Sequence, residues 1–406
     1  MKLVGGYPFF LIKDGLPFNY PALERSIKTE VLIIGGGISG ALVAYQLINA
    51  GVDCVVVDAR TIGLGSTCAS TSLLQYEIDI PLSVLIEKIG LQQAVSAYKL
   101  CEKAIGKLAA IDKKIGCGEF EFKKSLYYAP NQTKYAALRK EFEARKENGF
   151  KVRWLEEKDI KKHYGFAAPA AILSDAAAQT DAYKFTHALH QYSIQQGLKV
   201  YDRTEVIDIA YQRNSILTTT SNGSKIKAKY IIYANGYEAI NYIDKKIVEV
   251  QFTYAVASEQ YPAGTSFWRD EPLIWNMADP YLYMRTSKDR RIFVGGRDEK
   301  FSDECRLEKV IQSKSKQLKK DFEKLFPTIK FKPEFSWAGT FVTTGDGLPF
   351  IGSMKDKPNS YFALGFGGNG ITFSQVAAEI ITDLIIKGGS KYGKLFSFER
   401  ISSQMK

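Results

Sequence analysis

Residues 29–40, T-E-V-L-I-I-G-G-G-I-S-G, decide the fold of this chain. A β-branched apolar run reaches Ile34 and passes directly into the motif Gly35-x-Gly37-x-x-Gly40, which opens a stretch of helical periodicity. The first glycine permits a tight turn, the second lets the backbone approach a pyrophosphate, and the third lets helix and strand pack closely. The helix N-terminus then offers free N–H groups and the positive end of its dipole to the phosphates. The stretch therefore predicts a strand, a turn and a helix that hold a dinucleotide.

The segment that follows completes a βαβ unit. The helix ends at Gly51, and Cys54–Val57 reads as a second short apolar strand. Asp58 ends this strand, 18 residues after Gly40, where a carboxylate accepts hydrogen bonds from ribose hydroxyls. The G-K-[ST] sequence of a P-loop is absent. Strand, helix, second strand and terminal acid in this order predict a Rossmann-like α/β domain.

A second motif of the same form, Gly365-x-Gly367-x-x-Gly370, follows an apolar strand at 361–364 and opens a helix at 371–387. No further strand ending in an acid comes after that helix, so the motif does not predict a second dinucleotide site. One interpretation is that the helix N-terminus faces the N1 and C2 carbonyl region of a flavin, where negative charge develops on reduction. The alternative is an ordinary glycine turn.

The remaining pattern is mixed helix and strand. Residues 1–28 carry three prolines without periodicity and are expected to form an extended arm. An Asn222-Gly223 pair within the alternating stretch 206–233 predicts a hairpin turn. The other expected helices span 94–111, 134–148, 183–196 and 306–326, and the other expected strands lie at 198–201 and within 248–297.

Composition places the chain among globular proteins of about two domains: 406 residues, 45% hydrophobic. We expect no transmembrane segment and no secretory signal, since no apolar run is long enough. Five scattered cysteines without a C-x-x-C pair favour a reducing cytoplasm over disulfides or zinc. The net charge of +11 comes from lysines interleaved with acids, which favours a solvated surface over a nucleic-acid partner.

Motifs spread over nearly the whole chain resemble those of the D-amino-acid oxidase (DAO) family of FAD-dependent oxidoreductases, which includes glycine oxidase and sarcosine oxidase. The resemblance rests on residues 29–40, V-V-V-D-A-R at 55–60 with G-L-G-S-T at 63–67, A-N-G at 234–236, W-A-G at 337–339, T-x-D-G-L-P-F-I-G at 344–352, and G-F-G-G-N-G-I-T-F-S at 365–374. The arm with its prolines and the C-terminal block lean toward the gamma-glutamylputrescine oxidase branch.

This resemblance implies a Rossmann-like FAD-binding domain (1–85, 155–245 and 338–406) interleaved with a substrate domain (86–154 and 246–337) on a large antiparallel or mixed sheet. It also implies that FAD lies extended, with its ring between the domains. The residues matched to cofactor contacts are Gly35, Gly37, Ile38, Ser39, Gly40, Asp58, Ala59, Arg60, Ser66, Thr67, Val206, Ala234, Gly236, Gly339, Asp346, Gly367, Gly368, Asn369, Gly370 and Ile371.

Three positions depart from the family pattern. Gly339 stands where sarcosine oxidases carry the cysteine that tethers the flavin, so FAD is expected to be non-covalent. Phe341 stands where glycine oxidase has the arginine that clamps the substrate carboxylate. Phe293 stands at the expected place of the lysine that activates oxygen. The electron acceptor, oxygen or another, is left open.

The candidate substrate residues are Tyr283 and Arg285, together with Phe341. In Tyr281-Leu-Tyr283-Met-Arg285, strand alternation puts two phenols and a guanidinium on one face, where they would bind a carboxylate and cage an amine. The alternative is a solvated arginine among half-buried sheet tyrosines. No metal site is expected, because the only three histidines do not cluster with acids or glycines.

The predicted function is oxidation of a C–N bond in a small amine or amino acid by hydride transfer to flavin N5. Such a reaction needs positioning and an unprotonated nitrogen more than a strong base. Two alternatives remain at this point: an FAD enzyme acting on tRNA or another nucleic acid, motivated by the positive charge, and an electron-transfer flavoprotein without small-molecule turnover.

Overall fold

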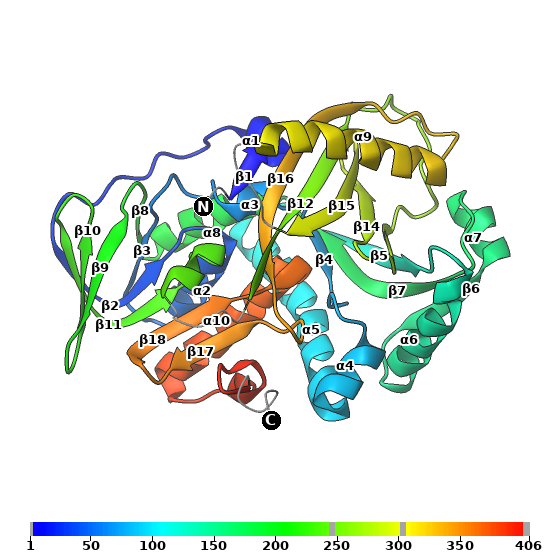
Figure 1. Ribbon diagram of the computed structural model, residues 1–406. Coiled ribbons are helices and arrows are strands. Elements are labelled where there is room, and N and C mark those ends of the chain that lie inside the picture. Colours follow the sequence, from blue (N-terminus) through cyan, green and yellow to red (C-terminus); the bar gives the residue numbers. More distant parts are fainter. Residues whose placement is uncertain (1–2, 243–247, 301–305, 401–406) are drawn as a thin grey trace.

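The computed structural model describes residues 3–242, 248–300 and 306–400 (Figure 1). Its smaller sheet has eight strands and a parallel centre in the order β8 (Lys199–Tyr201), β3 (Cys54–Val57), β2 (Ile27–Ile34), β11 (Lys225–Tyr233) and β18 (Lys357–Leu364). Antiparallel β17 (Phe350–Met354) closes one edge, and β9 (Val206–Tyr211) and β10 (Ile216–Thr220) extend from β11. The expected Rossmann-like α/β domain is confirmed.

The two faces of β2 explain its continuous apolar sequence. Val31 and Ile33 enter the core shared with the helices, whereas Leu32 and Ile34 enter a second core on the other side of the sheet. A parallel strand covered on both faces needs apolar residues at every position rather than at alternate ones. The helical side holds α2 (Ile38–Asn49), α8 (Ala182–Gln195) and α10 (Gly370–Lys387), with α2 packed against both of the others (Figure 1).

The larger sheet has ten strands in the order β1 (Val4–Gly6), β16 (Pro333–Thr343), β12 (Glu249–Ser258), β15 (Ile292–Lys300), β14 (Leu282–Thr286), β13 (Leu273–Asn276), β5 (Glu121–Tyr128), β7 (Ala170–Gln179) and β4 (Leu73–Gln75), with β6 (Val152–Glu156) beside β7. Helix α9 (Leu307–Leu325) crosses one face of β12, β15 and β16 (Figure 1). Its Leu307, Ile311, Leu318 and Phe322 recur at helical spacing and are buried there. The other face of these strands looks toward the smaller sheet.

The remaining helices are α1 (Phe9–Asp14), α3 (Ser66–Ala69), α4 (Leu82–Ile89), α5 (Leu91–Ile115), α6 (Tyr135–Glu147) and α7 (Glu157–Tyr164). The long expected helices and the Asn222-Gly223 hairpin, between β10 and β11, are confirmed.

The expectation of an extended arm over 1–28 is wrong in part. Strand β1 pairs with β16, and α1 buries Phe9 and Phe10 against Phe293. Six residues are too few to show helical periodicity, so tertiary packing decides this helix.

Sheet membership also departs from the expected domain ranges. Strands β1, β4 and β7 fall within the ranges expected for the cofactor domain but pair in the ten-stranded sheet, and β16 crosses the expected boundary at residue 338.

Candidate active site

A cavity joins the carboxyl end of the parallel strands to the exposed face of β12, β14 and β16. Nearly all of the sequence-predicted site residues line it. Those that do are Gly35, Gly37, Ile38, Ser39, Asp58, Ala59, Arg60, Ser66, Thr67, Val206, Ala234, Gly236, Tyr283, Gly339, Phe341, Gly367, Gly368, Gly370 and Ile371. Segments that are far apart in the sequence therefore line one and the same cavity.

The glycine turn between β2 and α2 forms the centre of the cavity wall. Gly35 has φ +109°, and a Cβ there would lie 2.6 Å from the carbonyl oxygen of Ala234. A Cβ on Gly40 would lie 1.8 Å from the carbonyl oxygen of Gly35, so Gly40 serves helix packing and does not line the cavity. The hydroxyl of Thr67 accepts from the N–H of Ile38 at 3.0 Å and brings a second segment to the start of α2.

Asp58 and Arg60 shape one end of the cavity. The Asp58 carboxylate accepts from the N–H of Gly36 at 2.7 Å and from the N–H of Arg60 at 2.9 Å, and burial raises its pKa. The Arg60 guanidinium donates to both carboxylate oxygens of Glu238, at 2.9 and 2.5 Å. Glu238 lies in η2 (Gly236–Tyr242), so this ion pair joins the end of β3 to the segment after β11.

The opposite end lies beneath the larger sheet. Thr253, Tyr283, Gly339 and Phe341 face it from β12, β14 and β16, and Tyr281 completes the wall. The N-terminus of α10 reaches the same end through Gly367, Gly368, Gly370 and Ile371. Asn369 does not line the cavity, because its amide donates to the carbonyl oxygens of Gln75 and Glu77, at 3.1 and 2.7 Å.

Arg285 is not on the cavity wall, which corrects the expectation that it anchors a substrate. The residue is 3% exposed, and its guanidinium donates to the carbonyl oxygens of Thr71, Thr180 and Thr286 at 2.7, 3.5 and 3.5 Å. It also lies over the ring of Phe293 at 4.7 Å, and burial lowers its pKa to about 10. Strand alternation correctly predicted that Arg285 lies on the same face of β14 as Tyr283. Residues 71–72, however, cover that face at Arg285 and leave only Tyr283 on the cavity wall.

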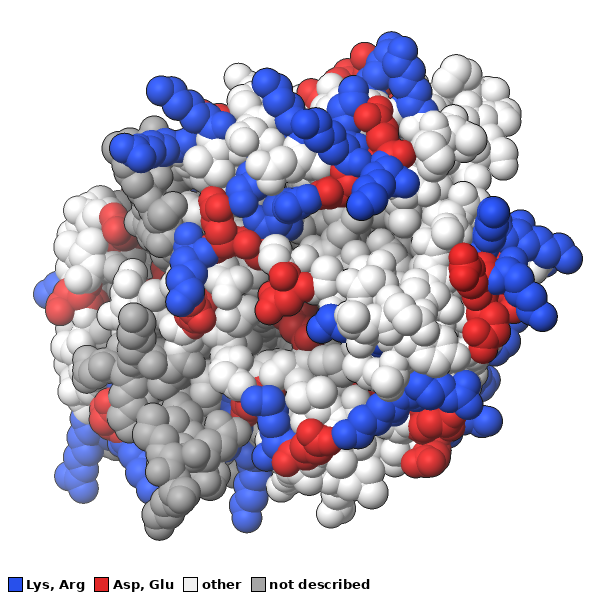
Figure 2. Space-filling model, turned by 45° about the vertical axis from the view of Figure 1, so that its right-hand side comes forward, with Lys and Arg blue, Asp and Glu red and all other residues white. Residues whose placement is uncertain are grey.

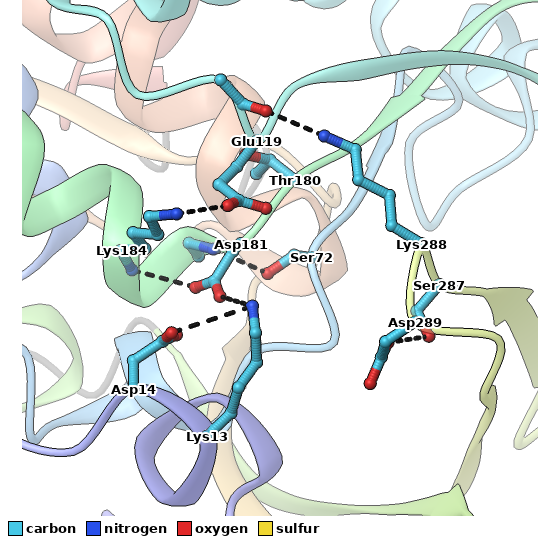
Figure 3. Close-up of polar contacts among 12 residues, drawn as sticks. Lys13, Asp14, Ser72, Glu119, Thr180, Asp181, Lys184, Ser287, Lys288 and Asp289 are labelled. Atoms are coloured by element: carbon cyan, nitrogen blue, oxygen red, sulfur yellow. Dashed lines mark hydrogen bonds and ion pairs between the residues drawn. The ribbon is translucent and has the colours of Figure 1, made fainter. Parts of the chain in front are cut away.

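Thr180, which accepts from Arg285, is followed by Asp181, and Asp181 belongs to a polar cluster that holds the N-terminal segment at Lys13 and Asp14. Asp181 accepts from Lys13 at 3.2 Å and from the N–H of Lys184 at 2.9 Å, and the Lys13 ammonium also lies 3.8 Å from the carboxylate of Asp14 (Figure 3). Burial raises the pKa of Asp181 to about 7, and a hydrogen bond with Asp14 acts in the same direction. The cluster is structural, since none of these three side chains lines the cavity.

Asp346 is also placed away from the cavity. Its carboxylate accepts from Arg400 at 2.8 Å and from the N–H of Leu348 at 3.1 Å, and so fixes the turn before β17. Cys68 is a buried filler whose thiol donates to the carbonyl oxygen of Gly65.

The sequence analysis did not predict the place of His190, because it expected none of the histidines to lie near the glycines of the motif. His190 on α8 is fully buried, and its Nε2 lies 2.9 Å from the carbonyl oxygen of Gly36. Glu238, Tyr237, Asp79 and Asp298 were also missed. The i, i+3 spacing of His187 and His190 was the available signal, because a helix face carrying two histidines and no charge is one that packs inward.

Within the described ranges, no group of three or more His, Cys, Asp or Glu side chains is arranged to hold a metal ion. No helix in the same ranges is long and apolar enough to cross a membrane.

The donors of this cavity fit FAD. The turn at Gly35 and Gly37 leaves room beside the N-terminus of α2 for a pyrophosphate, Asp58 lies at the ribose position, and a second helix N-terminus, that of α10, faces the far end. Only one complete dinucleotide unit is present among the described residues, because no parallel strand follows α10 in them.

Comparison with known proteins agrees with this arrangement. The family model described as DAO, FAD dependent oxidoreductase, matches residues 30–384. A putative Rieske 2Fe-2S iron-sulfur protein of Bacillus subtilis (strain 168) is 25% identical, covering 94% of this chain and 73% of its own. Gamma-glutamylputrescine oxidoreductase of Escherichia coli (strain K12) is 23% identical, covering 91% and 86%. The solved glycine oxidase of Geobacillus kaustophilus superposes with a TM-score of 0.78 at 18% identity, covering 92% and 99%.

Proposed function

This chain belongs to the DAO family of FAD-dependent oxidoreductases, and we propose that it oxidises a carbon–nitrogen bond of a small amine or amino acid. FAD, when bound, supplies the hydride acceptor at its flavin N5. The observation that carries the proposal is the continuity of the cavity from the glycine turn to Thr253, Tyr281 and Tyr283 on the larger sheet. Relatives whose names give a substrate act on gamma-glutamylputrescine, glycine or D-amino acids.

Different residues along the cavity bind different parts of the cofactor and the substrate. The glycine turn and the N-terminus of α2 hold the pyrophosphate, Asp58 holds the ribose, and Arg60 with Glu238 borders the adenine end. The N-terminus of α10 faces the pyrimidine edge, where its dipole favours negative charge. On the larger sheet, Tyr281 and Tyr283 orient the amine and exclude water from its reacting carbon.

The electron acceptor is a separate part of the proposal. Phe293 is fully buried among Phe9, Phe10 and Trp337, so no lysine stands at this position to activate oxygen. A relative named as a Rieske iron-sulfur protein favours an electron carrier over oxygen. We therefore infer slow reoxidation by oxygen, measurable by mixing the reduced protein with aerated buffer.

Charge on the surface favours a small substrate over nucleic acid. Figure 2 shows Lys and Arg side chains interspersed with Asp and Glu, without a continuous basic stripe on that face. Several lysines are held in ion pairs, among them Lys107 with Glu379 and Lys140 with Glu87. Buried free thiols at Cys54, Cys68 and Cys101 fit the reducing cytoplasm inferred from the sequence.

The deciding experiment is anaerobic bleaching of the flavin by a panel of amines, N-alkyl amino acids and free amino acids, with NADH as the contrast. We expect at least one amine to bleach the flavin and NADH to leave it oxidised. Rapid bleaching by NADH with no response to any amine would overturn the proposal.

A further inference from the structure

Two tyrosines and a threonine form the cavity wall at the end that lies beneath the larger sheet. The rings of Tyr281 and Tyr283 have centroids 5.8 Å apart and are tilted by 46°, and Thr253 lies beside them on β12. The electron-rich faces and phenol oxygens of such a pair attract an ammonium group and offer nothing to a carboxylate except hydroxyl donors.

Asp79 lies against one side of this wall. Its carboxylate accepts from the N–H of Gly368 at 2.7 Å, and Tyr281 donates its phenol hydrogen to it. Gly368 and Tyr281 both line the cavity, so the Asp79 charge stands directly behind the cavity surface. Burial raises the pKa of this carboxyl group.

Asp298 lies against the other side. Asp298 is part of β15, at an irregularity in the pairing of that strand with β12. Phe252 pairs with Glu299 and Tyr254 pairs with Gly296, so Thr253 falls between two successive pairs. The carboxylate of Asp298 is hydrogen-bonded to Thr253, yet its Oδ1 is buried without a hydrogen-bond partner in the part of the chain that the structure describes. Asp298 does not itself line the cavity, so its carboxyl group acts on a cavity occupant through its charge, across Thr253 and Tyr283.

The carboxyl groups around Asp298 favour a cation in the adjoining cavity. Burial, together with the charges of Asp79 and Asp279, raises the pKa of Asp298 to about 7, while the hydrogen bond with Thr253 and the charge of Lys314 act in the opposite direction. Lys314 is engaged elsewhere, donating to the carboxylate of Glu299 at 2.8 Å. A bound ammonium would relieve the repulsion between these carboxylates and keep Asp298 ionised.

Among the residues that the structure describes, no Lys or Arg side chain lines this end of the cavity. Arg60 is the only Lys or Arg among the described lining residues, and it is paired with Glu238 at the opposite end. Arg285 is sealed behind residues 71–72, and Phe341 presents a phenyl ring. A substrate carboxylate would thus meet the carboxyl groups of Asp79 and Asp298 and no cation among the residues described.

We propose that this site selects positively charged amines that carry no carboxylate, using Asp79 and Asp298 behind the Tyr281–Tyr283 wall, and that it rejects free amino acids. The inference rests on the proposed function, because it names the substrate class of that same cavity. It narrows the small amine or amino acid of that proposal to an amine recognised as its ammonium ion.

The test uses three probes that share a tert-butyl group and differ in charge: tert-butylamine, tert-butanol and pivalate. The carbon that bears the nitrogen of tert-butylamine has no hydrogen, so it cannot yield a hydride, and binding is measured independently of turnover. Titration calorimetry on the FAD-loaded protein at about pH 8 keeps the amine protonated and Asp298 ionised. We expect tert-butylamine to bind most tightly and pivalate most weakly. Pivalate binding as tightly as tert-butylamine would overturn the inference, even if amines bleach the flavin.

Variants identify the groups responsible. The double variant Asp79→Asn/Asp298→Asn keeps hydrogen-bonding amides but removes both charges, and we expect about tenfold weaker binding of tert-butylamine with tert-butanol unaffected. Asp175→Asn, an exposed position on β7, is the matched control and is expected to bind like the wild type. Unchanged affinity for tert-butylamine in a double variant that retains its FAD would refute the assignment. If the double variant does not fold, the order of the three probes on the wild type still decides the substrate class.

Discussion

His190 on α8 donates its Nε2–H to the carbonyl oxygen of Gly36 at 2.9 Å, which fixes the glycine turn from the side opposite the cavity. The carbonyl is an acceptor only, so the hydrogen is on Nε2, and Nδ1 has no hydrogen-bond partner among the described residues. Burial lowers the pKa of His190 to about 4, in keeping with a neutral ring. The turn that we propose to receive the pyrophosphate is thereby held by a side chain from a distant helix.

His190→Leu should weaken FAD binding, because it leaves the Gly36 carbonyl buried without its donor. The expected cost is about 1–3 kcal/mol, equivalent to roughly 5- to 150-fold in the dissociation constant if all of it falls on the FAD-bound state. His190→Gln, which retains an N–H donor, should recover part of the loss. His163→Leu, remote on α7, is the control. Titration of FAD into apoprotein measures the effect, and equal affinities for wild type and His190→Leu would contradict it.

The same histidine predicts a pH dependence of stability. Its folded pKa of about 4 lies below the unfolded value of about 6.5, so the unfolded chain binds more protons between these values. Stability from this site is present above about pH 6.5 and is lost as the pH falls toward 4, at about 1.4 kcal/mol per pH unit. The difference in unfolding free energy between wild type and His190→Gln should shift by this slope in favour of the variant. A difference that is constant with pH would contradict the prediction.

FAD should be released by denaturation, because Gly339 offers no thiol to the flavin. Gly339 lies on β16 and lines the cavity in which we propose that FAD binds, and a glycine there has no side chain to form a covalent link. Acid precipitation should leave yellow FAD in the supernatant, whereas colour retained in the pellet would show a covalent link through another residue.

Arg285→Ala should reduce stability more than it alters substrate selection. The substitution leaves the carbonyl oxygens of Thr71, Thr180 and Thr286 without this donor. Each hydrogen bond to a charged group contributes about 1.5–3 kcal/mol to the free energy of unfolding. The melting temperature should fall, while the order of affinities for the three tert-butyl probes is retained. A reversal of that order in a stable Arg285→Ala protein would return Arg285 to the substrate site.

Arg285 also shows what the sequence could and could not predict. The βαβ unit was predictable because turn, helix and terminal acid are local, and each glycine has a steric reason. Strand alternation likewise placed Tyr283 and Arg285 on the correct face of β14. Which part of that face stays open depends on residues 71–72 and on Phe10, which come from elsewhere in the chain. The roles of His190 and Asp298 could not be predicted for the same reason, because only the tertiary fold brings their partners close to them.

The ion pair of Arg60 with Glu238 should slow the release of FAD. It joins the end of β3 to η2 at the end of the cavity that also holds Val206, and the hydrogen bond with Glu238 raises the pKa of Arg60. The two side chains are 38% and 21% exposed, so the pair contributes only about 0.5–1 kcal/mol and is weakened by salt.

Glu238→Gln should therefore speed FAD dissociation by about two- to fivefold at low ionic strength, with a smaller difference at high salt. Glu87→Gln, which breaks the remote pair with Lys140, is the matched control and should leave the rate unchanged. Dissociation followed by the recovery of free-flavin fluorescence gives the rate, and a Glu238→Gln rate equal to the wild-type rate at low salt would show that the pair does not restrain the cofactor.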